Sequence, residues 1–192
     1  MAAHPDDEVL LAPYLASQCV NGTVSCSILV LTRGEGGGDP DVRTAEMARS
    51  AALLNLRLTQ WSLPDLMTPW PDRDTLVRQV GDVIAIERPD MILTFDPAHG
   101  STGHPAHRET GSIVLETGAS EVYLLETLAR FAGDGFELSG AETSTWVIHA
   151  GPEWEYVVRA AEIHASQFSA AQVESLRTLP ADQRRVWLRR GL

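Results

Sequence analysis

Hydrophobic positions along the chain form short continuous runs that alternate with stretches of helical periodicity. The run at 27–32 (SILVLT) is apolar throughout, as expected of a strand buried on both faces. Between 41 and 55, Met47, Ala51 and Leu54 recur at the i, i+4, i+7 spacing of one helix face. The same pattern predicts further strands at 59–63, 91–95, 122–126 and 145–149, and helices from 72 or 74 to Pro89, from 104 or 105 to 117, around 154–161 and at 181–190. This alternation predicts a Rossmann-like α/β fold, a mainly parallel sheet covered by helices, as a single domain over 1–192.

The segment HPDDE at 4–8 has the composition of a loop that follows a strand. Only residues 1–3 precede it, whereas a strand usually has about five or six residues. Two explanations stay open: either the first strand is stunted, or the protein begins upstream of Met1.

Composition and charge exclude several classes of partner. Hydrophobic residues make up 44% of the 192 residues and charged residues 21%, which is typical of a soluble globular protein. The formal net charge of −11 argues against binding to nucleic acid or to an anionic membrane surface. No signal peptide and no run of about 18 apolar residues is found, so we expect a cytoplasmic protein acting on a small molecule. The oligomeric state is left open.

The two cysteines, Cys19 and Cys26, show neither a CxxC motif nor the spacing of a zinc site. We therefore favour two reduced thiols in the core over a disulfide or a pair of metal ligands.

Two clusters of histidines and acids lie where predicted strands end. The first is HPDDE at 4–8, and the second runs from FDP at 95–97 to GHPAH at 103–107. Carboxyl ends of strands share one edge of an open α/β sheet, so the two clusters are expected to meet there. Either cluster alone reads as a helix cap or as ordinary surface residues. Together they indicate a catalytic metal site, since imidazole and carboxylate ligands suit Zn²⁺.

These two segments, AHPDDE and TFDP…GHPAH, resemble the two signatures of the PIG-L/LmbE-like zinc-dependent deacetylases. The resemblance runs over most of the chain: it includes the Gly-rich turn followed by VRTAE at 42–46, LPD at 63–65 and HASQ at 164–167. It implies hydrolysis of the acetamide of an N-acetylglucosaminyl-type or related substrate, which releases acetate and a free amine. It also implies a bound Zn²⁺, with Fe²⁺ as another possible metal.

The resemblance also assigns roles to individual residues. It implies His4, Asp7 and His107 as metal ligands, Asp6 as general base, His104 as oxyanion stabiliser or acid, and Arg43 and Asp65 as substrate-binding residues.

Some of these assignments have plainer alternatives. Arg43 at i, i+3 to Glu46 is also explained by a helix ion pair, and Asp65 by a turn after a proline. We expect His164 to be a buried packing residue.

One departure from the family pattern concerns the second cluster. Ala106 stands where the family usually has an acid that orients a neighbouring imidazole. Together with the short start of the chain, it suggests rival functions: a relative that binds sugar or metal without turnover, or a hydrolase of a larger amide or a phosphoester.

Overall fold

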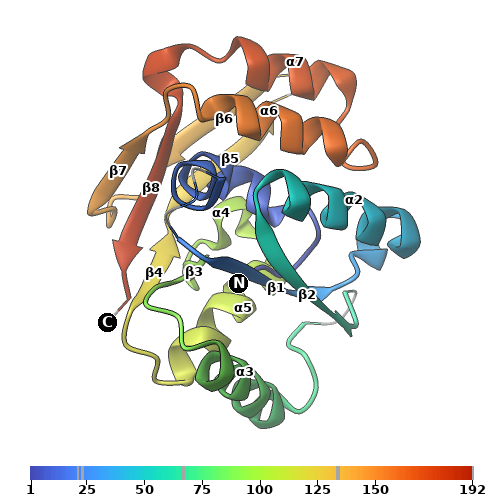
Figure 1. Cartoon of the computed structure of the whole chain (residues 1–192), viewed down its shortest axis with the longest axis vertical. Coiled ribbons are helices and arrows are strands. Elements are labelled where there is room, and N and C mark those ends of the chain that lie inside the picture. Colours follow the sequence, from blue (N-terminus) through green and yellow to red (C-terminus); the bar gives the residue numbers. More distant parts are fainter. Residues whose placement is uncertain (21, 23, 66–67, 133–134, 192) are drawn as a thin grey trace.

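The computed structural model describes residues 1–20, 22, 24–65, 68–132 and 135–191, which form a mixed α/β fold (Figure 1). Its strands are β1 (Cys26–Thr32), β2 (Leu56–Leu63), β3 (Ile92–Phe95), β4 (Val122–Leu125), β5 (Thr127–Ala132), β6 (Gly135–Gly140), β7 (Trp146–His149) and β8 (Arg185–Arg190). Its α-helices are α1 (Ala12–Leu15), α2 (Pro40–Leu53), α3 (Arg73–Glu87), α4 (Gly100–Gly103), α5 (Pro105–Glu116), α6 (Trp154–Ile163) and α7 (Ala170–Thr178). Short non-α helical turns are η1 (Asp7–Leu11), η2 (Ala16–Val20), η3 (Glu35–Gly37) and η4 (Ala181–Gln183).

Parallel strands occupy the part of the fold that carries the two clusters. β1 pairs in parallel with β2, and β3 pairs in parallel with β4. Beyond β4 the sheet continues with antiparallel β8 and β7, and β5 and β6 form a separate antiparallel hairpin. The predicted α/β class is confirmed, and the C-terminal part adds antiparallel strands to it.

Alternate residues of β1 enter two apolar layers. Ile28 and Val30 pack in the layer formed with α2 and α6, whereas Leu29 and Leu31 pack in the layer formed with α3 and α5. Figure 1 shows these helix pairs on opposite sides of the strands. The continuous apolar run at 27–32 is therefore explained by burial on both faces.

Ala2 and Ala3, which precede the first cluster, form backbone hydrogen bonds with β1. Ala2 forms a parallel bridge to Val30, and its N–H donates to the carbonyl of Leu29 at 2.9 Å. The carbonyl of Ala2 accepts from Leu31 at 3.1 Å, and that of Ala3 accepts from Thr32 at 3.0 Å. His4 therefore follows a segment that is hydrogen bonded to the edge of β1.

The predicted helix at 181–190 is wrong, because most of this segment is strand β8. Val186 and Leu188 are buried (1% and 4% exposed) and alternate with less buried neighbours, as a strand requires. Pairing with both β4 and β7 supplies the hydrogen bonds that hold the segment extended.

The predicted pair of reduced thiols is also wrong: Cys19 and Cys26 form a disulfide. Cys19 in η2 and Cys26 in β1 have their Cα atoms 5.8 Å apart, within the range that a disulfide spans. Spacing in the sequence does not reveal this proximity.

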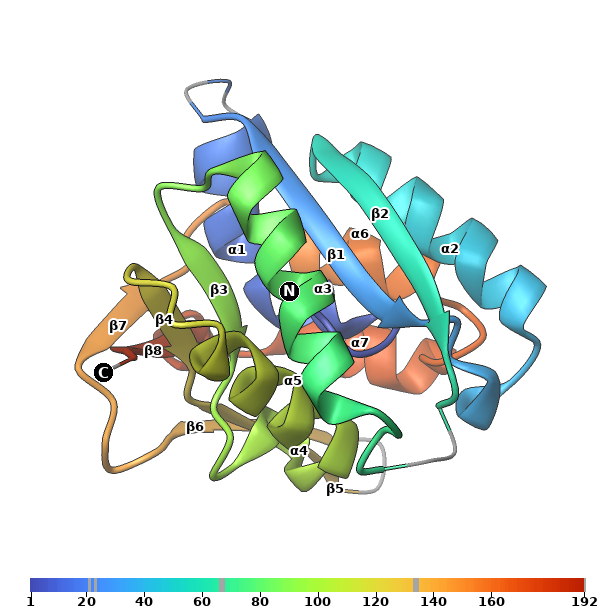
Figure 2. The same cartoon turned by 90° about the horizontal axis from the view of Figure 1, so that it is seen from below.

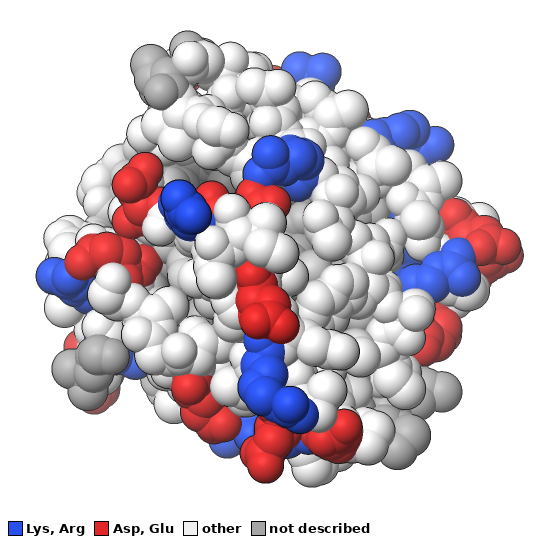
Figure 3. Space-filling view, turned by 60° about the horizontal axis from the view of Figure 1, so that its bottom comes forward, with Lys and Arg blue, Asp and Glu red and all other residues white. Residues whose placement is uncertain are grey.

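Two features of the described part of the chain bear on possible partners. None of its helices has the length and apolarity needed to cross a membrane. On the face drawn in Figure 3, arginine side chains are scattered among acidic ones and do not gather into a basic patch.

Candidate active site

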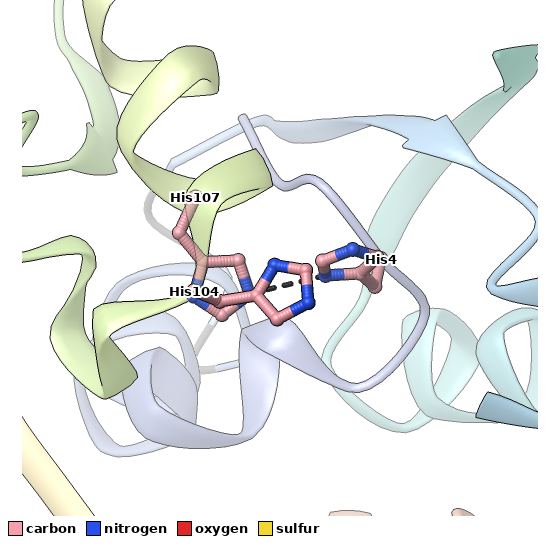
Figure 4. Close-up of side chains that lie close together, drawn as sticks. All are labelled: His4, His104 and His107. Atoms are coloured by element: carbon pink, nitrogen blue, oxygen red, sulfur yellow. Dashed lines mark hydrogen bonds between the residues drawn. The ribbon is translucent and has the colours of Figure 1, made fainter. Parts of the chain in front are cut away.

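The two clusters meet at the carboxyl ends of β1 and β3. HPDDE leads from the segment beside β1 into η1, and the second cluster leads from β3 through α4 into α5. Figure 4 shows the rings of His4, His104 and His107 converging, and one ligand atom of each lies within 4.8 Å of the others. The predicted meeting of the two clusters is confirmed.

Three potential metal-ligating atoms lie closest together. Nδ1 of His4 is 3.0 Å from Nε2 of His107, which is 3.0 Å from Oδ1 of Asp7. The distance from Nδ1 of His4 to Oδ1 of Asp7 is 3.7 Å. Tetrahedral ligands at zinc bond lengths are separated by roughly 3.3 Å. The donor set and its spacing therefore fit a zinc ion held by His4, Asp7 and His107.

The other atoms of these side chains are held by neighbouring groups. Nδ1 of His107 lies 2.9 Å from the carbonyl of Gly100, so this nitrogen carries the proton and Nε2 offers a lone pair. Nε2 of His4 lies 2.7 Å from Oδ1 of Asp65, an ion-pair contact without the geometry of a directed hydrogen bond. Oδ2 of Asp7 accepts from the N–H groups of Ala3 and His4, both at 2.8 Å. The remaining ligand atoms thus face one another.

Charged neighbours strongly shift the pKa values of His4 and Asp7. Burial acts to lower the pKa of His4, but its contacts with Asp65 and Asp7 outweigh burial and raise the pKa to about 10. Burial acts to raise the pKa of Asp7, yet the nearby His107 and His4 hold it well below its usual value. A cation among these atoms, either a second proton on His4 or a metal ion, would satisfy the converging acceptors.

Asp6 lies beside the three ligands in an unusual backbone conformation. Its φ of 109° is in a region that non-glycine residues seldom adopt. Burial, followed by the charge of Asp7, raises the pKa of Asp6 to about 7, while Arg43 acts in the opposite direction. A carboxyl group with this pKa can both take and return a proton near neutral pH.

Arg43 is almost completely buried (4% exposed) beneath the first cluster. Its guanidinium donates to the carbonyls of Pro5 at 2.6 Å and Gly34 at 2.7 Å, and it lies 3.2 Å from Oδ1 of Asp6. The approach to Gly34 is so close that a Cβ at this glycine would lie 2.5 Å from the guanidinium carbon. Arg43 thus pairs with Asp6, and the alternative of a helix ion pair with Glu46 is wrong.

His104 is the exposed member of the histidine cluster and the N-cap of α5. Its Nδ1 accepts from the N–H of Ala106 at 3.3 Å, so a neutral ring carries its proton on Nε2. Partial burial of the ring, followed by the charges of His4 and His107, lowers the pKa of His104. The ring therefore presents a neutral N–H donor at the site.

Two supporting groups were not assigned a role from the sequence. The backbone carbonyl of Gly100 orients His107, and Glu8, the last acid of the first cluster, accepts from the N–H of Asp6 at 3.2 Å. Glu8 also lies 2.6 Å from Nε2 of His164, which is fully buried as predicted. Glu8 could have been found from the sequence, because it belongs to the acidic run DDE at 6–8. The carbonyl of Gly100 could not, because every residue has a backbone carbonyl.

Comparisons with solved structures show the same fold. An N,N'-diacetylchitobiose deacetylase from Pyrococcus horikoshii, complexed with its inhibitor MPG, has a TM-score of 0.76 at 20% identity, over 99% of this chain and 81% of its own. A conserved protein from Thermus thermophilus has a TM-score of 0.74 at 18% identity, over 100% and 92%. The 4-carboxy-2-hydroxymuconate hydratase GalB from Pseudomonas putida has 0.69 at 16% identity, over 100% and 94%.

Sequence comparison identifies the family. None of the curated proteins compared with the chain matches it. The model of the PIG-L family, described as GlcNAc-PI de-N-acetylase, matches residues 1–117, more than half of the chain and the part that carries both clusters. The chain therefore belongs to the PIG-L family of de-N-acetylases, which are amide-hydrolysing enzymes.

Proposed function

We propose that the protein hydrolyses the acetamide of an N-acetylglucosaminyl-type or related small N-acetylated substrate, using a metal ion held by His4, Asp7 and His107. The observation that carries this proposal is the convergence of two imidazole nitrogens and one carboxylate oxygen within 3.7 Å of one another. Three acceptors that face one another repel unless a proton or a metal ion lies between them, so the arrangement favours a cation.

Zn²⁺ is the metal that this set of two histidines and one carboxylate suits best, and Fe²⁺ is the alternative. When bound, the metal polarises the acetyl carbonyl and lowers the pKa of a water molecule towards about 7.

Asp6 is the group that we assign to proton transfer. It takes a proton from the attacking water, whose oxygen forms a bond to the acetyl carbon, and it returns a proton to the nitrogen as the C–N bond breaks. A pKa of about 7 allows both steps near neutral pH. Arg43, held by the carbonyls of Pro5 and Gly34, fixes the position of the Asp6 carboxylate.

His104 is better placed as a hydrogen-bond donor than as an acid. Its lowered pKa keeps the ring neutral at pH 7, and its Nδ1 is taken by the N–H of Ala106. The remaining Nε2–H donates to the oxygen that gains negative charge when water adds to the carbonyl.

The contacts of Asp65 favour support of the metal ligands over substrate binding. Oδ2 of Asp65 accepts from the N–H of Gly36 at 2.9 Å, and Oδ1 lies at ion-pair distance, 2.7 Å, from Nε2 of His4, so the carboxylate faces a metal ligand. Binding of substrate by Arg43 and Asp65 stays a prediction that a complex must test.

The alanine at 106 does not argue for a silent relative. Ala106 is fully buried in the apolar layer under α5, while the carbonyl of Gly100 orients His107. The orientation that an acid gives elsewhere in the family is supplied here by the backbone.

The test combines zinc content with acetate release from N-acetylglucosamine and its glycosides. We expect about one zinc per chain, loss of zinc in His4→Ala and His107→Ala, and retained zinc with lost acetate release in Asp6→Asn. His149→Ala, an exposed histidine on β7, is the matched control and is expected to behave as wild type. Wild-type zinc content and activity in His4→Ala and His107→Ala would show the proposal to be wrong. Because a hydratase shares the fold, products are identified directly: acetate and amine support the deacetylase, and water addition to a double bond refutes it.

A cytoplasmic location is also a proposal, resting on composition. Disulfides persist mainly in oxidising compartments, so the Cys19–Cys26 bond bears on it. Alkylation of the native protein in freshly lysed cells tests the point: free thiols support the cytoplasm, and a protected disulfide favours an oxidising compartment.

A further inference from the structure

Four buried polar residues lie behind the first cluster and have no part in the reaction described above. Glu8, Glu46, Ser50 and His164 are each at most 3% exposed. They belong to η1, α2 and the end of α6, elements whose apolar side chains form one layer of the core. Figure 2 shows α2 and α6 on one side of β1 and α3 on the other. We call these four residues the buried polar group.

Glu8 is the residue that connects the buried polar group to Asp6. Its Oε1 accepts from the hydroxyl of Ser50 at 2.5 Å and lies 2.6 Å from Nε2 of His164. An ionised carboxylate can only accept, so the imidazole is the donor in this contact. Its Oε2 accepts from the backbone N–H of Asp6 at 3.2 Å. Glu8 therefore transmits the position of α2 and α6 to the amide of Asp6.

His164 follows the last residue of α6 and is fixed by the residues after it. Its carbonyl accepts from the N–H of Gln167 at 2.8 Å and from that of Phe168 at 3.0 Å. Ser166 donates to Glu46 through its N–H at 3.0 Å and also through its hydroxyl. The other oxygen-facing nitrogen of the ring, Nδ1, lies 4.0 Å from Oε2 of Glu46. The ring of His164 is thus held with its Nε2 directed at Glu8.

Asp6 needs such support because its backbone conformation is strained. Its φ of 109° and ψ of −16° lie where non-glycine residues are seldom found, and its side chain makes no capping hydrogen bond to η1. Such conformations persist only where surrounding contacts hold them. Arg43 donates to the carbonyl of Pro5, and Glu8 accepts from the N–H of Asp6. These two groups belong to the same peptide unit, which is therefore held at both of its polar atoms.

Packing alone does not explain the ion pair between Glu8 and His164. Its neighbours in this layer, among them Met47, Val157 and Ala161, are apolar. Apolar side chains of similar volume often give equal or greater stability than a buried ion pair, because burial removes the hydration of the charges. The pair therefore favours a role in orientation, and the group that it orients is the amide of Asp6.

We propose that His164 is a positioning residue for the proton transfer assigned to Asp6. Through Glu8 it holds the peptide between Pro5 and Asp6, and this peptide keeps the Asp6 carboxylate in its place beside the metal ligands. His164 acts through Glu8 and not by contact with the reacting atoms. The inference rests on the proposed function, in which Asp6 takes and returns the proton.

The test compares His164→Leu with His164→Gln. Leucine has a similar volume and no donor, whereas the side-chain amide of glutamine can place an N–H close to the position of Nε2. Leu176→Ala is the matched control, because Leu176 is a fully buried residue of α7 in the same apolar layer. Its truncation lowers the stability of the layer and leaves the donors to Glu8 in place.

Zinc content, melting temperature, and kcat and KM for acetate release are measured on the zinc-loaded proteins. Hydrogen exchange of the Asp6 amide is measured as well, with the amide of Ile113, a buried residue of α5, as the reference. Exchange at Asp6 reports its hydrogen bond to Glu8 whether or not a substrate is turned over. A wild-type protein that releases no acetate would refute the proposed function, and exchange at Asp6 then decides the positioning role by itself.

We expect His164→Leu to lower kcat by about 10- to 100-fold, because a small displacement of a catalytic group costs on that order. KM should stay within about twofold, since the loss concerns the reaction step. The Asp6 amide should exchange at least about tenfold faster relative to Ile113. His164→Gln should keep kcat within about threefold of wild type, because the donor to Glu8 is retained.

Two properties should not follow the loss of kcat. Zinc content should stay at the wild-type level in His164→Leu, because Oδ2 of Asp7 is held by the N–H groups of Ala3 and His4. Leu176→Ala should lower the melting temperature and leave kcat and the relative exchange of Asp6 unchanged.

Three results overturn the proposal. Wild-type kcat and unchanged exchange at Asp6 in His164→Leu show that the histidine only packs. A loss of kcat in Leu176→Ala as large as in His164→Leu shows a general effect of lower stability. A fall in zinc content that parallels the fall in kcat shows that the buried polar group supports the metal ligands and not Asp6.

Discussion

Replacing Asp65 with Asn tests how far the metal centre depends on a residue outside both clusters. Oδ1 of Asp65 lies 2.7 Å from Nε2 of His4, and Oδ2 accepts from the N–H of Gly36 at 2.9 Å. Asparagine has nearly the same shape but only one acceptor oxygen, so one of these two donors loses its partner. The negative charge that favours a proton on Nε2 of His4 is lost as well.

The expected effect is a weaker metal site with an intact fold. Loss of a partner that orients a ligating histidine typically costs about 10- to 100-fold in metal affinity. This corresponds to about 1.4–2.7 kcal/mol of binding free energy. The pKa of His4, now raised to about 10 largely through Asp65 and Asp7, is expected to fall in the variant.

Competition with a chromophoric chelator at pH 7.5 measures zinc affinity in the two proteins. Asp41→Asn is the matched control, because Asp41 is an exposed acid on α2 that pairs with Arg33 away from the cluster. The reasoning about His4 is refuted if Asp65→Asn binds zinc within about twofold of wild type, since that leaves less than about 0.5 kcal/mol for the contact. It is equally refuted if Asp41→Asn loses as much affinity.

Three further predictions follow from the same structure. Zinc affinity should rise about tenfold per pH unit from pH 7 to 9 and level off above about 10, because binding displaces one proton from His4, and chelator competition across pH measures this. Gly111→Ala should lower the free energy of unfolding by about 1–3 kcal/mol, since a Cβ there would lie 2.1 Å from the carbonyl oxygen of Phe95. Gly81→Ala on α3 should raise the free energy of unfolding by about 1 kcal/mol, because a Cβ there has nothing within 4 Å and alanine favours a helix. Urea unfolding measures the stability of both variants. Burial acts to lower the pKa of His164, but Glu8 outweighs it and raises that pKa, so the charged ring stabilises the fold fully below about pH 6.5 and less as pH rises through the folded value. The melting-temperature difference between wild type and His164→Asn should therefore shrink from pH 6 to pH 9, and a constant difference contradicts this sign.

Local patterns predicted the elements that carry the site, because those elements are buried in a simple way. β1 and β3 are apolar runs. The helical period of α2 includes Met47 and extends to Leu54, the residue that caps the end of the helix, and both are fully buried. The arginines and the leucine at 185–190 are good helix formers, so local preference favours a helix where the structure has a strand. Its alternating buried residues were a strand signal, but pairing with β4 and β7 decides the outcome. The start of α7, by contrast, has a local signal in the sequence, because Ser169 and Gln172 form a capping box.

The composition of the site was predictable, whereas its supporting contacts were not. Histidine and carboxylate in two clusters after strands indicate a metal site, whereas the choice of His4, Asp7 and His107 as its ligands is what the resemblance to the family implies. That Asp65 contacts His4 depends on how the turn after β2 folds back, and neighbouring residues do not determine it. The Cys19–Cys26 disulfide was not predicted because its formation also depends on how the chain folds and not on the neighbouring residues.

The position of the two clusters on different strand pairs links metal binding to the sheet. His4 and Asp7 follow the segment beside β1, whereas His107 stands on α5, which packs on β3 through the close approach of Gly111 to Phe95. In the described structure, backbone hydrogen bonds of residues 1–3 connect the β1 edge to the β3 edge. A metal ion that needs Nδ1 of His4 and Nε2 of His107 about 3 Å apart therefore favours the arrangement in which the pair β1–β2 and the pair β3–β4 are held together.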